Sequence, residues 1–171
     1  MQIRASSFKG DRPPCVVDAA HPVHVHGAYS RYANCNDQQR EAIARFLCVL
    51  CGHTLSVLPN HCLPYRAIGV ALVEKHFDAQ AQPETAPAPL VTQKEKGCLK
   101  RAWHRFGLRV TALTVVLGQM LQRRACAPKP CWSALRRQGN LAAILRQLAR
   151  PFNTSLLHDY RCLRPWPAHS G

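Results

Sequence analysis

The fold expected for this chain depends on one stretch, Phe46-Leu47-Cys48-Val49-Leu50-Cys51-Gly52-His53-Thr54-Leu55-Ser56-Val57-Leu58-Pro59. Two cysteines are separated by two residues, and Gly52 follows them with the backbone freedom that a tight turn needs. Such a turn, called a knuckle here, directs both thiolates to one point. Because Zn²⁺ prefers about four ligands in a tetrahedron, with sulfur at roughly 2.3 Å, the knuckle predicts half of a zinc site.

The other half of the site is expected upstream. In a zinc ribbon, a first pair of cysteines precedes a hairpin, and Cys15 has the right place, 33 positions before Cys48. Asp18 stands where the second cysteine of that pair is expected, and a carboxylate oxygen is a less usual zinc ligand. The predicted metal ligands are Cys15, Cys48 and Cys51, and the fourth is left open among Asp18, His21 and Cys35.

The residues around the knuckle predict three short strands. Residues 21–27 alternate apolar and polar, with Val23 and Val25 on one face and His24 and His26 on the other. Those two histidines are typical of a solvated strand edge, with metal binding as the alternative. Residues 42–47 and 53–58 supply the second and third strands. The position of a first knuckle at Cys15, then a hairpin, the knuckle at Cys48 and a third strand, in this order, predict a zinc-ribbon-like β module over residues 12–62.

Three segments of the chain resemble bacterial zinc-ribbon proteins of unknown function that are similar to the N-terminal regions of insertion-sequence transposases. The matching residues are His26–Tyr32, Ile43–Pro59 and Leu63–Arg66, with a looser match at Arg101–Phe106. The resemblance implies a zinc ribbon followed by helices and a role beside DNA or a transposase. The family usually has a complete first Cys-x-x-Cys and a Phe at the place of Leu55, and this chain departs from it at both points.

Composition and charge restrict the class of protein. Of 171 residues, 9 are cysteine, and residues 1–9 have no apolar run typical of a secretory signal, which favours a reducing compartment and metal ligands over disulfides. We therefore expect a cytoplasmic protein, associated with the nucleoid if it binds DNA. No apolar run reaches the ~20 residues that cross a bilayer. Residues 1–93 have 8 basic and 7 acidic side chains, whereas residues 94–171 have 15 and 2, a net charge of +13.

The second half of the chain is expected to be helical and basic. Residues 63–80 predict a connecting helix opened by Pro64, and residues 81–93, with three prolines, predict a linker. Residues 94–150 predict a basic helical region in which Gly107 separates two helices and a further helix runs from Ser133 to Arg150. Residues 151–171 predict an irregular tail. The fold class is therefore α+β, with a small N-terminal zinc-ribbon-like β module before a mostly helical, basic C-terminal half.

An excess of basic residues of this size favours a polyanion as partner, and nucleic acid is the commonest. The two helices joined at Gly107 predict either a helix-turn-helix that enters a DNA groove or a packed helical hairpin with a basic rim. The residues expected to contact phosphates are Arg66, Lys100, Arg101, Arg105, Arg123, Arg124, Arg136, Arg137 and Arg146.

The sequence favours a binding protein over an enzyme. A transposase needs carboxylates that hold two metal ions, and residues 94–171 offer only Glu95 and Asp159. No glycine-rich phosphate loop and no small-molecule site is evident. The leading hypothesis is a non-catalytic DNA-binding protein with Zn²⁺ as cofactor. The alternatives are a metal-stapled module that contacts a transposase or another protein, and a truncated transposable-element remnant without activity.

Overall fold

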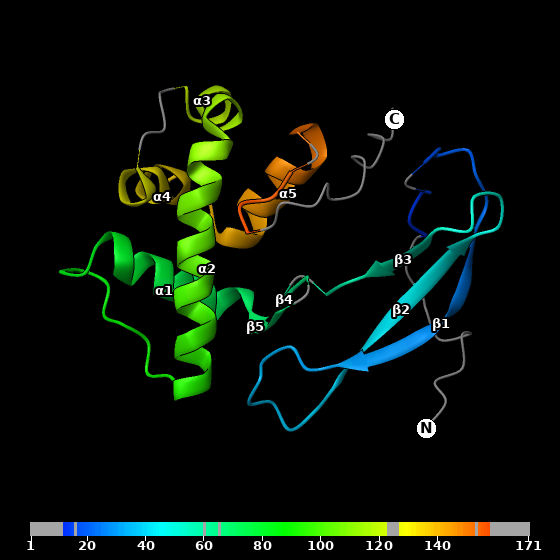
Figure 1. Cartoon of the computed structure of the whole chain (residues 1–171), viewed down its shortest axis with the longest axis horizontal. Coiled ribbons are helices and arrows are strands. Elements are labelled where there is room, and N and C mark those ends of the chain that lie inside the picture. Colours follow the sequence, from blue (N-terminus) through cyan, green and yellow to red (C-terminus); the bar gives the residue numbers. More distant parts are fainter. Residues whose placement is uncertain are drawn as a thin grey trace.

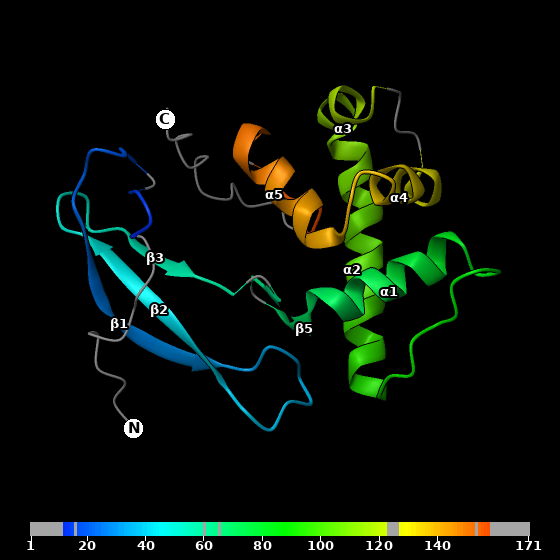
Figure 2. The same cartoon turned by 180° about the vertical axis from the view of Figure 1, so that it is seen from behind.

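The structure, a computed structural model, describes residues 12–157 except 16, 60, 65, 123–126 and 153. It has the expected α+β class, with short antiparallel strands first and helices after them. The first three strands form a sheet at one end of the molecule, the helices gather at the other end, and a short two-stranded hairpin lies between them (Figures 1 and 2).

The three strands predicted around the knuckle are confirmed. Strands β1 (Val23–Arg31), β2 (Glu41–Cys48) and β3 (Thr54–Val57) form one antiparallel sheet in the order β1-β2-β3. Val25 pairs with Phe46, and Phe46 pairs with Leu55, so the apolar side chains of the three strands share a face. An irregularity between Val25 and Gly27 interrupts the register of the first pair.

The hydrophobic core of this sheet is small. It consists of five buried residues, which are Cys15, Val23, Phe46, Cys48 and Leu55. A module of about 50 residues rarely folds on so little buried apolar surface and commonly needs a metal ion or a disulfide. The β module is therefore expected to need a bound metal ion or another cross-link to fold stably.

The helix predicted to begin at Pro64 begins later. Residues Arg66–Gly69 form strand β5, which pairs with β4 (Cys62–Leu63), and helix α1 runs from Val70 to Ala81. A short apolar run does not by itself distinguish strand from helix. Residues 66–69 form a strand because they pair with Cys62 and Leu63. The end of this strand is also held by Asn34, whose side chain accepts a hydrogen bond from the backbone N–H of Gly69.

The break predicted at Gly107 is wrong. Helix α2 runs from Gln93 to Ala112 without interruption, and helix α3 (Thr114–Leu121) follows after a single residue. Glycine inside a helix costs only about 1 kcal/mol, and the buried side chains of Phe106 and Val110 on either side of it offset that cost. A Cβ atom at position 107 would lie 3.4 Å from Pro128, so a glycine suits this close approach. The helix-turn-helix at Gly107 is therefore not formed.

The single helix predicted over residues 133–150 is two helices. Helix α4 runs from Pro128 to Arg136 and helix α5 from Leu141 to Phe152, so Ser133 lies inside α4 and caps nothing. Gly139, with φ 157°, allows the turn between them, and the side chain of Asn140 accepts a hydrogen bond from the N–H of Ala143 at 2.9 Å. The sequence signals for this boundary are the adjacent glycine and asparagine.

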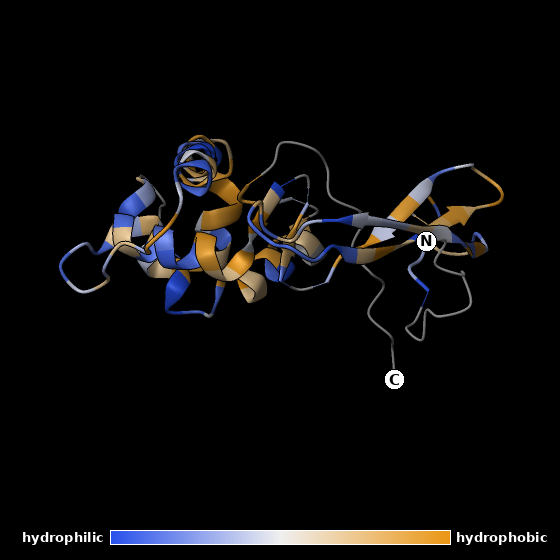
Figure 3. Ribbon diagram, turned by 90° about the horizontal axis from the view of Figure 1, so that it is seen from below, coloured by the Kyte–Doolittle hydropathy of each residue, from blue (hydrophilic) through white to orange (hydrophobic). Residues whose placement is uncertain are grey.

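All five helices share one hydrophobic core. Phe77 of α1 lies 4.9 Å from Trp103, 5.2 Å from Phe106 and 5.1 Å from Trp132, measured between ring centroids. Helix α1 is thus part of the core rather than a connector, and the boundary of charge at residues 81–93 lies inside one packed unit. Hydrophobic and hydrophilic residues alternate along the helices, as expected when each buries one face (Figure 3).

The start of the predicted tail also belongs to this core. Leu156 and Leu157 are fully buried, and Arg109 of α2 donates hydrogen bonds to the carbonyl of Ser155 and the hydroxyl of Thr154. The remaining residues of the predicted tail, 158–171, lie outside the described residues.

Two carboxylates of α1 organise the helices around them. Asp78 accepts hydrogen bonds from Trp132 Nε1 at 2.8 Å and from Arg136 Nε at 2.9 Å. Glu74 forms an ion pair with Arg136 at 3.4 Å and accepts a hydrogen bond from the backbone N–H of Leu141, which begins α5. Helices α1, α4 and α5 are therefore held by one half-buried polar network.

The loop between β1 and β2 joins the sheet to the helices. Asn36 donates a hydrogen bond to Thr92 at 2.9 Å, and Lys94 donates one to the carbonyl of Cys35 at 3.5 Å. Thr92 is also the N-cap of α2 and forms a capping box with Glu95. The distal end of the hairpin thus lies against the first turn of α2 (Figure 1).

Candidate metal centre and nucleic-acid interface

The knuckle has the backbone turn that its sequence predicts. The N–H of Gly52 donates to the carbonyl of Cys48 at 3.0 Å, and the N–H of Cys48 donates to the carbonyl of His53 at 3.0 Å. Gly52 has φ 67°, a left-handed conformation that favours glycine. The turn places Cys48, at the end of β2, and Cys51 on the same side of the chain.

Four side chains meet at this turn, and they are Cys15, His21, Cys48 and Cys51. Sγ of Cys15 lies 3.4 Å from Sγ of Cys51 and 3.7 Å from Nδ1 of His21. A tetrahedral ion with Zn–S and Zn–N bonds of ordinary length separates its ligands by about 3.8 Å between sulfurs and about 3.6 Å between sulfur and nitrogen. The four ligand atoms all lie within 4.8 Å of one another, so this cluster could hold a metal ion.

The surroundings of the cluster favour a cation. Cys15 and Cys48 are buried, and His21 and Cys51 are half-buried. Burial raises the pKa of Cys15, but backbone hydrogen bonds at Asp18 and Val17 outweigh it and lower that pKa to about 6. The backbone at His53 lowers the pKa of Cys51, whereas burial and the neighbouring thiols raise it to about 11. A cation bound among these sulfurs would stabilise them together as thiolates.

Asp18 lies beside the cluster rather than in it. Its Oδ2 atom is 3.8 Å from Nε2 of His21, the ring nitrogen that faces away from the sulfurs, and its Oδ1 atom accepts a hydrogen bond from the N–H of Ala20 at 3.0 Å. At 3.8 Å this is an ion-pair contact, and it places a carboxylate on the outer nitrogen of the histidine, where metal-ligating histidines commonly have one. The other candidate ligands lie away from the cluster. Cys35 is in the distal loop of the hairpin, and His24 is exposed on β1.

Replacing Asp18 with alanine is expected to weaken metal binding by about 10- to 100-fold while leaving its stoichiometry unchanged, because the carboxylate acts through His21. Competition with a chromophoric chelator measures this affinity. Asp37→Ala, at the far end of the hairpin, is the matched control and should leave the affinity unchanged. A loss of stoichiometric binding in Asp18→Ala would instead make Asp18 a ligand.

The structure separates the predicted phosphate contacts into two groups. Arg136 is paired with Asp78 and Glu74, and Arg66 donates a hydrogen bond to the carbonyl of Leu157, so both stabilise the fold from within. The exposed side chains are those of Lys100, Arg101, Arg105, Arg137 and Arg146. Arg123 and Arg124 lie outside the described residues.

Helix α2 carries the densest exposed basic surface of the described chain. Lys96, Lys100, Arg101 and Arg105 are exposed and spread over the solvent side of α2, away from its buried residues Leu99, Ala102, Phe106 and Val110. Lys96 and Arg105 stand on the two flanks of this side, because nine residues turn a helix by half a circle, and we call the four side chains the basic face. Lys94 and His104 extend it, so that the charges cover about 16 Å of helix. The one carboxylate of α2, Glu95, is engaged in the capping box. Lys96 was missing from the predicted contacts, although its spacing of four residues from Lys100 indicates a shared face.

No helix in the described part of the chain is long and apolar enough to cross a membrane.

Comparison with known proteins gives no relative on which a function could be based: no family model, no curated protein and no solved structure matches the chain.

Proposed function

We propose that this chain is a non-catalytic DNA-binding protein in which Zn²⁺ staples the β module and the basic face of α2 binds the phosphate backbone. The observation that carries the proposal is the basic face itself, where four exposed cations are spread over the solvent-facing half of one helix with no exposed carboxylate among them. Contacts to phosphates position a protein on nucleic acid and supply most of its affinity without reading bases.

The donor set supports zinc as the metal. Three sulfurs and one imidazole nitrogen at tetrahedral spacing suit Zn²⁺, whereas Mg²⁺ and Ca²⁺ prefer oxygen ligands. Four protein ligands leave no position for a substrate, which is the arrangement of a structural zinc rather than a catalytic one. Because the core of the sheet has five buried residues, the binding energy of such an ion would contribute much of the folding free energy of the β module.

The carboxylates of the helical half support a binding role over catalysis. Glu74 and Asp78 are bonded to Arg136, and Glu95 belongs to the cap of α2. These contacts stabilise the fold, and the cation at which Glu74 and Asp78 converge is the side chain of Arg136. These ion pairs also neutralise the carboxylates of α1, so little negative charge is left near the exposed cations of α2.

We expect weaker binding to a 20-base-pair duplex when the four residues of the basic face, Lys96, Lys100, Arg101 and Arg105, are changed together to glutamine. The slope of log K against log salt concentration should become less steep by about 3 to 4, because each neutralised phosphate contributes about 0.9 to its magnitude. Fluorescence anisotropy at several salt concentrations measures both quantities.

A matched control removes the same number of exposed cations elsewhere, at Arg12, Arg40, Lys75 and Lys129. This variant has the same net charge and should keep most of the wild-type slope. Equal losses in the two variants would contradict a localised interface on α2 and leave only general attraction to a basic protein.

One observation favours a second candidate function, binding of another protein through the knuckle. Val49 and Leu50, between the two knuckle cysteines, are 55% and 66% exposed. Exposed apolar side chains on a rigid turn are a common feature of docking sites. Substituting both with serine should leave DNA binding unchanged, which separates this surface from the basic face.

A further inference from the structure

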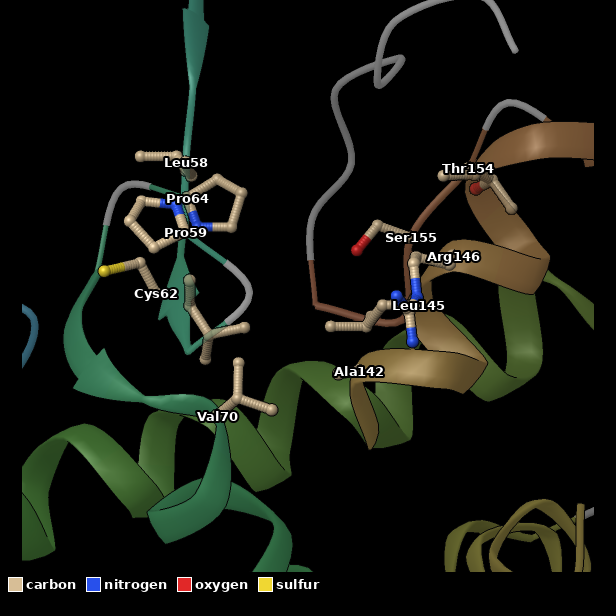
Figure 4. A pocket seen from close by; sticks show the side chains of 12 residues that line it. Leu58, Pro59, Cys62, Pro64, Val70, Ala142, Leu145, Arg146, Thr154 and Ser155 are labelled. Atoms are coloured by element: carbon tan, nitrogen blue, oxygen red, sulfur yellow. The ribbon is translucent and has the colours of Figure 1, made fainter. Parts of the chain in front are cut away.

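A groove separates the β4–β5 hairpin from helix α5 (Figure 4). Its volume is about 220 Å³. One wall is formed by Leu58, Leu63 and Val70, and the other by Ala142, Leu145 and Ala149. Figure 4 shows the side chain of Leu145 pointing into the space between the walls, whereas the sulfur of Cys62 points away from it. The groove thus presents an apolar interior of a size suited to a small ligand.

The one charged side chain among the residues that line the groove is basic. Arg146 is exposed, and none of the residues that line the groove is acidic. Within the described residues, the guanidinium group of Arg146 has neither a carboxylate nor a carbonyl partner. A cation at the edge of an apolar groove without a counter-ion is complementary to an anionic head group on an apolar body.

A buried hydroxyl lies on the same side as Arg146. Ser155 is only 6% exposed, and Figure 4 shows its oxygen directed towards the groove. That oxygen accepts a hydrogen bond from the N–H of Leu157 at 3.3 Å, and the carbonyl of Ser155 is fixed by Arg109 at 3.1 Å. No acceptor for the hydroxyl proton is found within the described residues, so Ser155 has a donor to offer.

We propose that the groove binds a medium-chain aliphatic carboxylate of about eight carbons. Its chain lies between Leu63 and Leu145, and its carboxylate accepts hydrogen bonds from Arg146 and from the hydroxyl of Ser155. The groove is too small for the larger ligands that fill ordinary drug-sized pockets. This site shares no residue with the basic face of α2 or with the metal cluster.

The test uses the full metal-loaded chain and octanoate, with octanol as the neutral analogue and butanoate as the short one. Titrations followed by NMR chemical shifts should show one saturable site, with the largest shifts at residues 142–149. Each added methylene strengthens binding about fourfold until the groove is filled, so octanoate should bind at least tenfold more tightly than butanoate.

Two variants distinguish the head-group contact from general attraction to a basic protein. Arg146→Gln should weaken octanoate binding at least tenfold and leave octanol binding unchanged. Arg137→Gln removes an exposed cation outside the groove and should change neither. Equal binding of octanoate and octanol to the wild type, equal effects of the two variants, or shifts centred away from α5 would each overturn the proposal.

Discussion

Replacing Cys48 with serine is expected to release the metal ion and to unfold the β module while the helices stay folded. Cys48 is fully buried and belongs both to the ligand cluster and to the five-residue core of the sheet. A structural zinc contributes apparent binding energies of about 10–16 kcal/mol to folding, far more than so small a core can supply. The helices have their own core around Phe77 and Trp132, which explains why they should survive.

Metal analysis should find about one zinc in the wild type and close to none in this variant. The NMR signals of β1, β2 and β3 should lose their dispersion, and the helical circular dichroism should persist. Cys35→Ser is the matched control, because Cys35 is a half-buried cysteine outside the cluster. A Cys48→Ser protein that keeps its zinc and its β-sheet signals would exclude the proposed site.

The second large effect is expected from Asp78→Ala, which should lower the free energy of unfolding of the helical half by about 3 kcal/mol. The substitution removes the acceptor of Trp132 Nε1 and of two nitrogens of Arg136. Arg136 would then keep Glu74 as its ion-pair partner at 3.4 Å, while the indole N–H of a fully packed tryptophan would lose its acceptor.

Urea unfolding followed by tryptophan fluorescence and circular dichroism measures this change. Glu84→Ala provides the control, since Glu84 is an exposed carboxylate in the segment after α1 and its loss should change stability by less than about 0.5 kcal/mol. If the two alanine variants were equally stable, the network around Asp78 would contribute nothing beyond surface charge.

The β module could be predicted from sequence because its signals are local. Alternation fixes the strands around Val23 and Phe46, and the spacing of Cys48 and Cys51 with Gly52 fixes the knuckle. The fourth residue of the cluster could not be chosen, because Asp18, His21 and Cys35 are all near enough along the chain. Only the path of the backbone before β1 brings Nδ1 of His21, rather than a carboxylate, to the sulfurs.

The helical half was harder to predict because its boundaries depend on packing. Gly107 was expected to end a helix, yet the buried faces on either side of it continue α2. Arg136 and Arg137 are neighbours with the same chemistry, but α1 supplies carboxylates only to Arg136. Sequence spacing shows which residues share a helix, whereas the partner that another helix offers decides which cation stays exposed.

The β1–β2 hairpin has a mechanical consequence. One end of it carries Cys48, and the other end bonds Thr92 at the cap of α2. A strand of nine residues spans about 30 Å, so the hairpin reaches from the cluster of cysteines and histidine to the first turn of α2. The distal loop of the hairpin meets the first turn of α2 through the hydrogen bonds of Asn36 to Thr92 and of Lys94 to Cys35, so a shift of the hairpin would act first on the cap of that helix.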